Sequence, residues 1–269
     1  MNHDEAVPLF PPALLLDELG INEPRDIDIE AVAEFCGATI VYDFLEGCEA
    51  RLIGYNDKAI ITVNCMAQRE RQRFSAGHEL GHWMQDRGQT AFSCKASTFA
   101  TEWWQDNPER RANRYATDLL LPEGMFRARA RGREMTFATV RALAEEFQTS
   151  LTATAIRLIE LGSFPAMIIC NEVGVGRRWF IRGPDVPDAL WPREMPRGET
   201  IAFELLHGES KRSGPLNVYA DGWINHPDAR RYKVREDSVK ITPRLVLSLL
   251  WWENESQPTD REGDAASWC

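Results

Sequence analysis

The sequence has few of the residues that usually hold structural metals or disulfides. Its six cysteines include no pair at C-x-x-C spacing, and a chain of 269 residues does not need disulfides for stability. We therefore expect reduced thiols and exclude a zinc site built on thiolates. A metal ion would have to use imidazole and carboxylate ligands, and there are only five histidines: His3, His78, His82, His207 and His226.

The sequence also lacks an excess of positive charge and any long apolar run. Its 31 basic and 41 acidic side chains give a formal net charge of −10, which excludes a broad positive field for nucleic acid or anionic membranes. No apolar stretch is long enough to span a bilayer, and the N-terminus carries acids where a signal peptide has bases. With 43% hydrophobic residues, the composition is globular. We expect a cytoplasmic protein with no membrane partner.

Hydrophobic periodicity predicts an α+β fold for the first half of the chain. Helices are predicted over 28–36, 67–87 and 108–121, and strands over 38–44, 51–55 and 59–63. The strands predict a small, largely antiparallel sheet that leads into the second of these helices. The run 58–64 is either plain sheet or an edge strand that pairs with an extended peptide.

The second half of the chain changes from helical to β-type patterns. Helical spacing over 136–162, with a turn at 148–150, is typical of a helix-turn-helix. Strands are predicted over 166–170, 178–181, 201–206 and 216–220, and either a strand or a helix over 245–252. The predicted division is an N-terminal domain (1–125), a helix-turn-helix-like segment (126–163), a mixed α/β C-terminal domain (164–252) and a flexible tail (253–269).

The segment His78-Glu79-Leu80-Gly81-His82 is an HExxH motif. On a helix, its two histidines lie one turn apart on one face, so both imidazoles can bind one Zn²⁺. Glu79 lies about 100° round the helix from His78, which suits a general base acting on a water rather than a ligand. The alternative is two unrelated helix histidines. The metzincin extension is excluded, because Gln85 and Gly88 occupy the positions of its glycine and histidine.

A third protein ligand is needed for a tetrahedral catalytic site. Glu109, in the first turn of the helix predicted from Pro108, is the candidate; the alternative is a solvated acid favoured by the helix dipole. Asn113 follows one turn later on the same face. Its amide oxygen is placed to accept a proton from a zinc-bound imidazole and fix the tautomer.

Two glycines in the HExxH helix are unusual for a helix interior. Gly77 and Gly81 each weaken it by about 1 kcal/mol relative to alanine. Glycine is required at these positions if another backbone packs closely against that face of the helix. The alternative is that the two glycines have no structural role and are merely tolerated.

Two longer blocks surround these candidates. They are Arg71-Gln72-Arg73-Phe74-Ser75-Ala76-Gly77-His78-Glu79-Leu80-Gly81-His82 and Glu109-Arg110-Arg111-Ala112-Asn113-Arg114-Tyr115-Ala116-Thr117-Asp118-Leu119-Leu120-Leu121-Pro122. In order and spacing they resemble the ImmA/IrrE family of zinc metallo-endopeptidases, whose pattern is close to RxRFTxAHELGH followed by ExxANxFAxxLLxP. The resemblance covers residues 10–125, extends less closely to 162 and is weak beyond. Ser75, Gly77 and Tyr115 depart from the pattern without removing a ligand.

The resemblance implies a zincin-like minimal peptidase domain over 1–125. One Zn²⁺ per chain would be held by His78, His82 and Glu109, with Glu79 as the catalytic base and Asn113 behind the ligands. It also implies hydrolysis of a partner protein, a helix-turn-helix transcriptional repressor, in a regulated stress or mobile-element response. The C-terminal domain is then expected to sense a signal, as a GAF-like domain would by analogy. Mn²⁺ or another divalent ion also suits this donor set.

A non-proteolytic transcriptional regulator or sensor with a structural metal site is the alternative. The helix predicted over 151–161 does not favour it, because it offers only Thr152, Thr154 and one base, Arg157, for reading DNA. We therefore do not expect sequence-specific DNA binding. For the oxyanion of the hydrolysis, His207 and His226 are candidate donors, without an assignment between them.

Overall fold

The structure, a computed structural model, describes residues 10–85, 91–94, 107–162, 164–209, 212 and 214–253. These residues form an α+β protein with two sheets, which confirms the predicted fold class. The chain divides into two compact units, unit 1 (Met1–Phe126 and Ala144–Ser150) and unit 2 (Arg127–Leu143 and Leu151–Cys269). The finer four-part division stays a prediction, and the tail from residue 254 onward lies outside the described residues.

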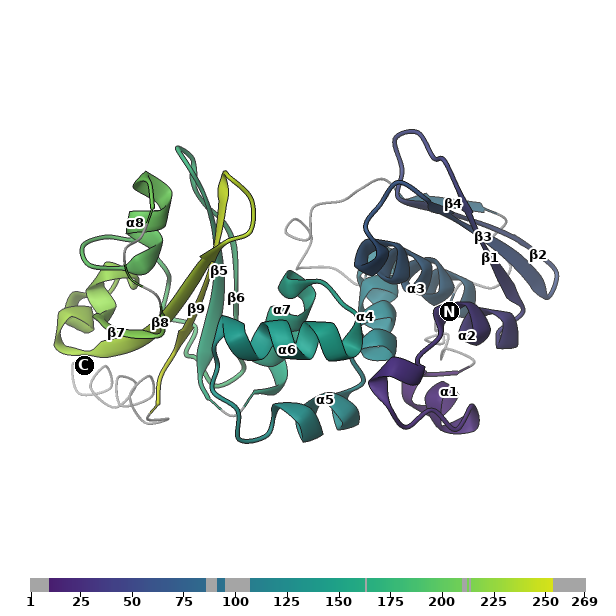
Figure 1. The fold of residues 1–269 in the computed structure, drawn as a ribbon, viewed down its shortest axis with the longest axis horizontal. Helices are drawn as coiled ribbons and strands as arrows, with labels where there is room; N and C mark the ends of the chain where they lie inside the picture. The colour runs from purple at the N-terminus through teal and green to yellow at the C-terminus, as the bar shows by residue number, and fades with distance from the viewer. Residues whose placement is uncertain are drawn as a thin grey trace, which may run out of the picture. The chain divides into compact units, whose positions relative to one another are not determined.

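Unit 1 has a four-stranded sheet with helices packed against it (Figure 1). Its elements are α1 (Pro12–Glu18), η1 (Pro24–Asp26), α2 (Ile29–Phe35), β1 (Ala38–Asp43), β2 (Ala50–Tyr55), β3 (Lys58–Asn64), α3 (Arg69–Gln85), β4 (Ala91–Cys94) and α4 (Pro108–Leu120). The predicted helices and strands of this part are confirmed to within about two residues, the usual uncertainty of element ends. No described helix is both long and apolar enough to cross a membrane.

The strand order of this sheet confirms one prediction and corrects another. The order is β1-β3-β2-β4, with β3 parallel to β1 and antiparallel to β2. Strands β2 and β4 also pair antiparallel, so the sheet is largely antiparallel, as predicted, with β1–β3 as its parallel pair. Because β3 is hydrogen-bonded on both sides, the prediction that 58–64 is an edge strand for an extended peptide is wrong. The edges of the described sheet are β1 and β4.

One face of the sheet anchors α3. Residues alternate between buried and exposed along β2 and β3, and Leu52 and Ile61 face the core that also contains Leu80 and Met84 of α3. The indole of Trp83 donates a hydrogen bond to the carbonyl of Cys36 at 2.9 Å. A helix held by both packing and a buried hydrogen bond gives a rigid base for the side chains on its other face.

The chain continues through a helical segment into a second sheet. The elements are α5 (Glu123–Ala130), α6 (Phe137–Phe147), α7 (Leu151–Leu161), β5 (Ala166–Glu172), β6 (Gly176–Arg182), α8 (Ile201–His207), β7 (Leu216–Tyr219), η2 (Ala220–Gly222), η3 (Pro227–Arg231), β8 (Lys233–Lys240) and β9 (Leu245–Trp251). The sheet is antiparallel, in the order β6-β5-β9-β8-β7. The run from Leu245 is thus a strand, and the turn at 148–150 is confirmed, with Gln148 at φ 53°.

The strand predicted over 201–206 is wrong, because this segment is helix α8. Its first turn is capped twice. The hydroxyl of Thr200 accepts a hydrogen bond from the amide of Phe203 at 3.2 Å, and the carboxylate of Glu236 accepts from the amides of Ile201 and Ala202 at 3.1 and 2.8 Å. These caps provide acceptors for the amides that a helix start leaves without partners. Their stabilisation of the helix outweighs the preference of this composition for a strand.

Strand β8 is not predicted by the sequence pattern, because most of its side chains are polar or charged. Two of them, Glu236 and Asp237, are nevertheless buried, at 0% and 7% exposed. Asp237 accepts a hydrogen bond from the amide of Phe137 at the start of α6, at 2.7 Å. Burial raises the pKa of both carboxyls, and the hydrogen bonds from helix amides oppose that shift. Consecutive residues of one strand therefore cap two helices.

Candidate metal centre

Helix α3 supplies both histidines of the HExxH motif. His78 and His82 lie one turn apart, and their Nε2 atoms are 3.2 Å from each other. Their rings meet edge to face, with centroids 4.8 Å apart. The side chains are 10% and 0% exposed. The spacing in the sequence therefore produces a pair of converging, shielded imidazole nitrogens, as predicted for one shared ion.

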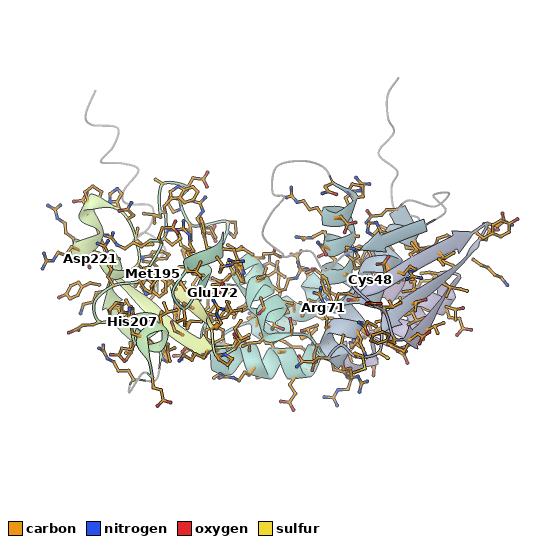
Figure 2. The ribbon with its side chains drawn as sticks, turned by 90° about the horizontal axis from the view of Figure 1, so that it is seen from above. Cys48, Arg71, Glu172, Met195, His207 and Asp221 are labelled. Atoms are coloured by element: carbon orange, nitrogen blue, oxygen red, sulfur yellow. The ribbon has the colours of Figure 1, made fainter. Side chains whose placement is uncertain are left out.

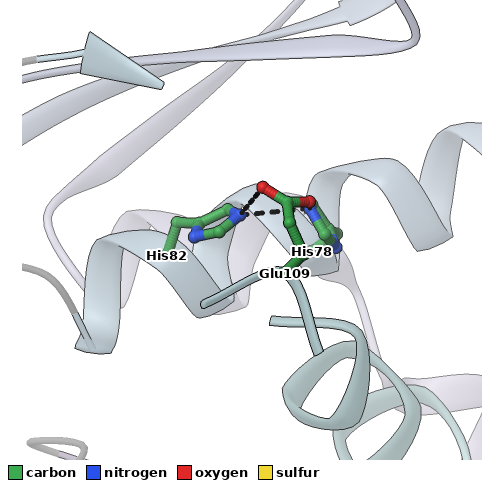
Figure 3. A group of neighbouring side chains, drawn as sticks. All are labelled: His78, His82 and Glu109. Atoms are coloured by element: carbon green, nitrogen blue, oxygen red, sulfur yellow. Dashed lines mark hydrogen bonds and ion pairs between the residues drawn. The ribbon is translucent and has the colours of Figure 1, made fainter. Parts of the chain in front are cut away.

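Helix α4 supplies the carboxylate. It begins at Pro108, and the side chain of Asn107 caps it by accepting from the amide of Glu109 at 3.0 Å. The Glu109 carboxylate extends toward the two imidazoles (Figure 3), with its oxygens 3.2 Å from Nε2 of His78 and 3.4 Å from Nε2 of His82. Its side chain is 42% exposed, so one side of the group faces solvent. A catalytic metal site needs such an open side.

The two helices approach closely at the glycines of α3. A Cβ added to Gly81 would lie 3.0 Å from Cα of Ala112, and one added to Gly77 would lie 3.4 Å from Cβ of Ala116. The predicted close backbone contact is thus confirmed, and it is tightest at Gly81. A side chain there would push away the helix that carries Glu109.

A side-chain clasp, not predicted from the sequence, joins the same two helices. The amide of Gln85 donates to the carbonyl of Arg111 at 3.3 Å, and the guanidinium Nε of Arg111 donates to the Gln85 amide oxygen at 3.2 Å. Both residues are part-buried, so the pair is partly shielded from water. The clasp fixes the end of α3 that carries His82 against the start of α4.

Asn113 is placed behind His78, where the sequence predicts it. Its amide oxygen lies 2.9 Å from Nδ1 of His78. An amide oxygen can only accept, so this contact puts the proton on Nδ1 and leaves the lone pair of Nε2 directed toward His82 and Glu109. A histidine in this tautomer is ready to bind a metal ion through Nε2.

The donor atoms fit a tetrahedral ion. Zn–N bonds of about 2.0–2.1 Å imply about 3.3 Å between neighbouring ligands of a tetrahedron. The observed separations, 3.2 Å between the two imidazole nitrogens and 3.2 and 3.4 Å from these to the carboxylate, agree with that edge. Within the part of the chain that the structure describes, His78, His82 and Glu109 are the group of metal-binding side chains that converges in this way.

Comparison with known families identifies this region. Residues 37–159 match the model of the Peptidase_M78 family, described as the IrrE N-terminal-like domain. These residues form an IrrE N-terminal-like domain. The match confirms the resemblance to the ImmA/IrrE family over this part of the chain, and the domain includes every side chain of the metal centre.

A solved structure shares the fold over most of the chain. A Mycobacterium tuberculosis transcriptional regulator superposes with a TM-score of 0.58 at 14% sequence identity, over 89% of this chain and 86% of that one. At this identity the likeness concerns the fold alone. No curated protein matches the chain in sequence.

Two other residues of the IrrE N-terminal-like domain bear on the predictions. Glu79 follows His78 on α3 and is completely buried, at 0% exposed. It is not one of the converging side chains, which are His78, His82 and Glu109. Tyr115 is 3% exposed, and its hydroxyl donates to the carbonyl of Phe10 at 3.2 Å. Tyr115 therefore packs in the hydrophobic core.

The two candidate oxyanion donors have local roles in unit 2. His207 (Figure 2) contacts the carbonyl of Phe203 through Nδ1 at 2.8 Å. His226 caps η3, where its Nδ1 accepts from the amide of Asp228 at 3.2 Å. Each imidazole thus makes a local hydrogen bond within its own helix or turn. The donor to the oxyanion stays unassigned.

Proposed function

We propose that this chain is a zinc-dependent endopeptidase that cleaves a partner protein. The observation that carries the proposal is the convergence of two imidazoles from α3 and one carboxylate from α4, with a fully buried glutamate next to the first histidine. The match of residues 37–159 to a peptidase family supports it. Two imidazoles, one carboxylate and an open side are the donor set of catalytic zinc.

In the proposed mechanism, His78, His82 and Glu109 hold the ion, and Asn113 keeps His78 in the binding tautomer. Zinc, when bound, supplies a Lewis acid that lowers the pKa of water and polarises the scissile carbonyl. Glu79 accepts the proton of the attacking water and then donates it to the leaving amine. Because water is the nucleophile, no covalent intermediate with the protein is needed.

We further propose that the substrate is a helix-turn-helix transcriptional repressor in the cytoplasm. This part rests on the ImmA/IrrE resemblance, which implies such substrates and conditional cleavage in a stress or mobile-element response. The C-terminal domain predicted over 164–252 would then carry the regulatory signal. A repressor encoded beside this protein's own gene is the first substrate to test.

The test is cleavage of that repressor by the full chain loaded with zinc, followed by mass spectrometry of the products. Glu79→Gln is expected to keep zinc and to lower the cleavage rate by about 10²–10⁴-fold, the usual contribution of a general base. The matched control is Glu70→Gln, an exposed acid in the first turn of the same helix, which should cut at the original rate.

Two results would contradict the proposal at different levels. Cleavage by Glu79→Gln at the rate of the original protein would refute Glu79 as the base. Elemental analysis that finds no divalent metal after incubation with zinc would refute the metal centre and the peptidase.

A further inference from the structure

A polar cavity lies in unit 1, with none of the metal-centre side chains in its lining. It has a volume of about 390 Å³ and is lined by Glu30 of α2, Tyr42 of β1, and Arg69, Gln72 and Arg73 of α3. This volume is within the range of about 300–1,000 Å³ typical of small-molecule sites. Arg73 and His78 are five positions apart on α3, which places them about 140° apart round the helix. The cavity and the metal centre therefore use different sides of α3.

Arginines dominate the charge of this cavity. Arg69 is exposed and forms no ion pair with any residue that the structure describes. Arg73 is only 6% exposed; one terminal nitrogen donates to the carbonyl of Ile27 at 3.1 Å, whereas its buried Nε has no hydrogen-bond partner among the described residues. A buried guanidinium nitrogen without a partner is costly, so Arg73 is not held there by hydrogen bonds of its own alone.

The carboxylate in the cavity is already engaged. Glu30 accepts a hydrogen bond from the hydroxyl of Tyr42. Burial, together with this hydrogen bond, raises the pKa of the Tyr42 phenol, so it stays a donor to Glu30. Burial also lowers the pKa of Arg73, and the negative charges of Glu30 and Asp28 oppose this shift. Two guanidinium groups thus face one carboxylate in the lining.

We propose that this cavity binds a small anion with a carboxylate or phosphate group, held between Arg69 and Arg73. The anion would pair with Arg69 and with the guanidinium of Arg73, which both line the cavity. Guanidinium groups bind both kinds of oxyanion through charge-assisted hydrogen bonds. The positive end of the α3 dipole, at Arg69, adds to the attraction. The cavity carries this positive lining although the chain as a whole has a net charge of −10.

The test measures thermal unfolding of the full chain against increasing inorganic phosphate or acetate, with chloride keeping the ionic strength constant. Arg69→Gln removes a cation of the lining at an exposed position, so folding should be preserved. The matched control is Arg71→Gln (Figure 2), which removes an arginine two positions away that pairs with Glu49 at 3.6 Å and does not line the cavity.

At least one of the two anions should raise the unfolding midpoint of the original protein and of Arg71→Gln more than chloride does. In Arg69→Gln the apparent affinity should fall about fivefold or more, because a charge-assisted contact is lost. A preference for phosphate or for acetate identifies the group that the cavity selects. Equal shifts in all three proteins would indicate a general salt effect or binding at the metal centre and would overturn the proposal. The absence of any shift beyond that of chloride would overturn it as well.

Discussion

At the scale of single residues, Asn113 of α4 holds the imidazole of His78 on α3. Its amide oxygen lies 2.9 Å from Nδ1 of His78. Asn113→Ala would leave that nitrogen without its acceptor and the ring free to turn or change tautomer. We expect zinc affinity to fall roughly 10–100-fold, the usual cost of losing a partner behind a metal ligand. Titration against a competing fluorescent chelator measures it.

Two further variants give this prediction its controls. Asn113→Asp keeps an acceptor oxygen at the same place and should retain most of the affinity. Asp118→Asn changes an acid of the same helix that pairs with Arg114 at 2.8 Å, away from the ligands, and should bind zinc normally. If Asn113→Ala binds zinc as tightly as the original protein, Asn113 has no role in positioning His78.

The residues of the centre differ in how far local sequence predicts them. The histidine pair follows from its spacing alone, because four positions on a helix bring two side chains to one face. Glu109 and Asn113 follow from a helix start marked by Asn107 and Pro108. The clasp between Gln85 and Arg111 has no such signal, since it depends on where the ends of two separate helices meet.

At the scale of helices and strands, the contact between α3 and α4 sets the distance across the metal centre. A Cβ at position 81 would lie 3.0 Å from both Cα of Ala112 and Cβ of Tyr115, which is closer than ordinary packing. We expect Gly81→Ala to lower the free energy of unfolding by about 1–3 kcal/mol, although alanine favours a helix by about 1 kcal/mol. It should also weaken zinc binding, because α4 carries Glu109.

Gly77→Ala is the matched control for this prediction. Its Cβ would be 3.4 Å from the nearest atom, an ordinary contact, so stability should be unchanged or raised by up to about 1 kcal/mol. Urea denaturation of both variants, followed by tryptophan fluorescence, gives the comparison. Equal stability of the two would show that α4 moves without cost and that the glycines do not set the spacing.

The type of an element can be predicted from sequence where a single hydrophobic periodicity decides it. The prediction fails where contacts with other elements decide the type. Strands β2 and β3 alternate strictly, and α3 and α4 have clear starts, so they are predictable. Helix α8 and strand β8 are not, because Glu236 of the strand caps the helix and each is explained only by the other. The position of β3 inside the sheet also depends on pairings that no local pattern encodes.

For the molecule as a whole, burial and charge together bear on the alternative function, a DNA-binding regulator. Arg157, the one base of α7, is 1% exposed and pairs with Glu160 at 3.2 Å, and Thr154 is 0% exposed. A recognition helix must instead present polar side chains to base edges in the major groove. Exposed arginines at 127, 131 and 133 can contact phosphates only, within a chain of net charge −10.

We therefore expect no sequence-specific DNA binding by the full chain, with or without zinc. Any association with random duplex DNA should be no tighter than about 10⁻⁶ M at physiological salt and should weaken steeply as salt rises, because it would rest on phosphate contacts. Selection from a randomised duplex library, followed by fluorescence anisotropy on the recovered sequences, measures both properties. Recovery of one sequence that binds at least a thousandfold more tightly than random DNA would contradict this prediction. It would mean that α7 moves to expose Arg157, and it would favour a DNA-binding regulator over a peptidase.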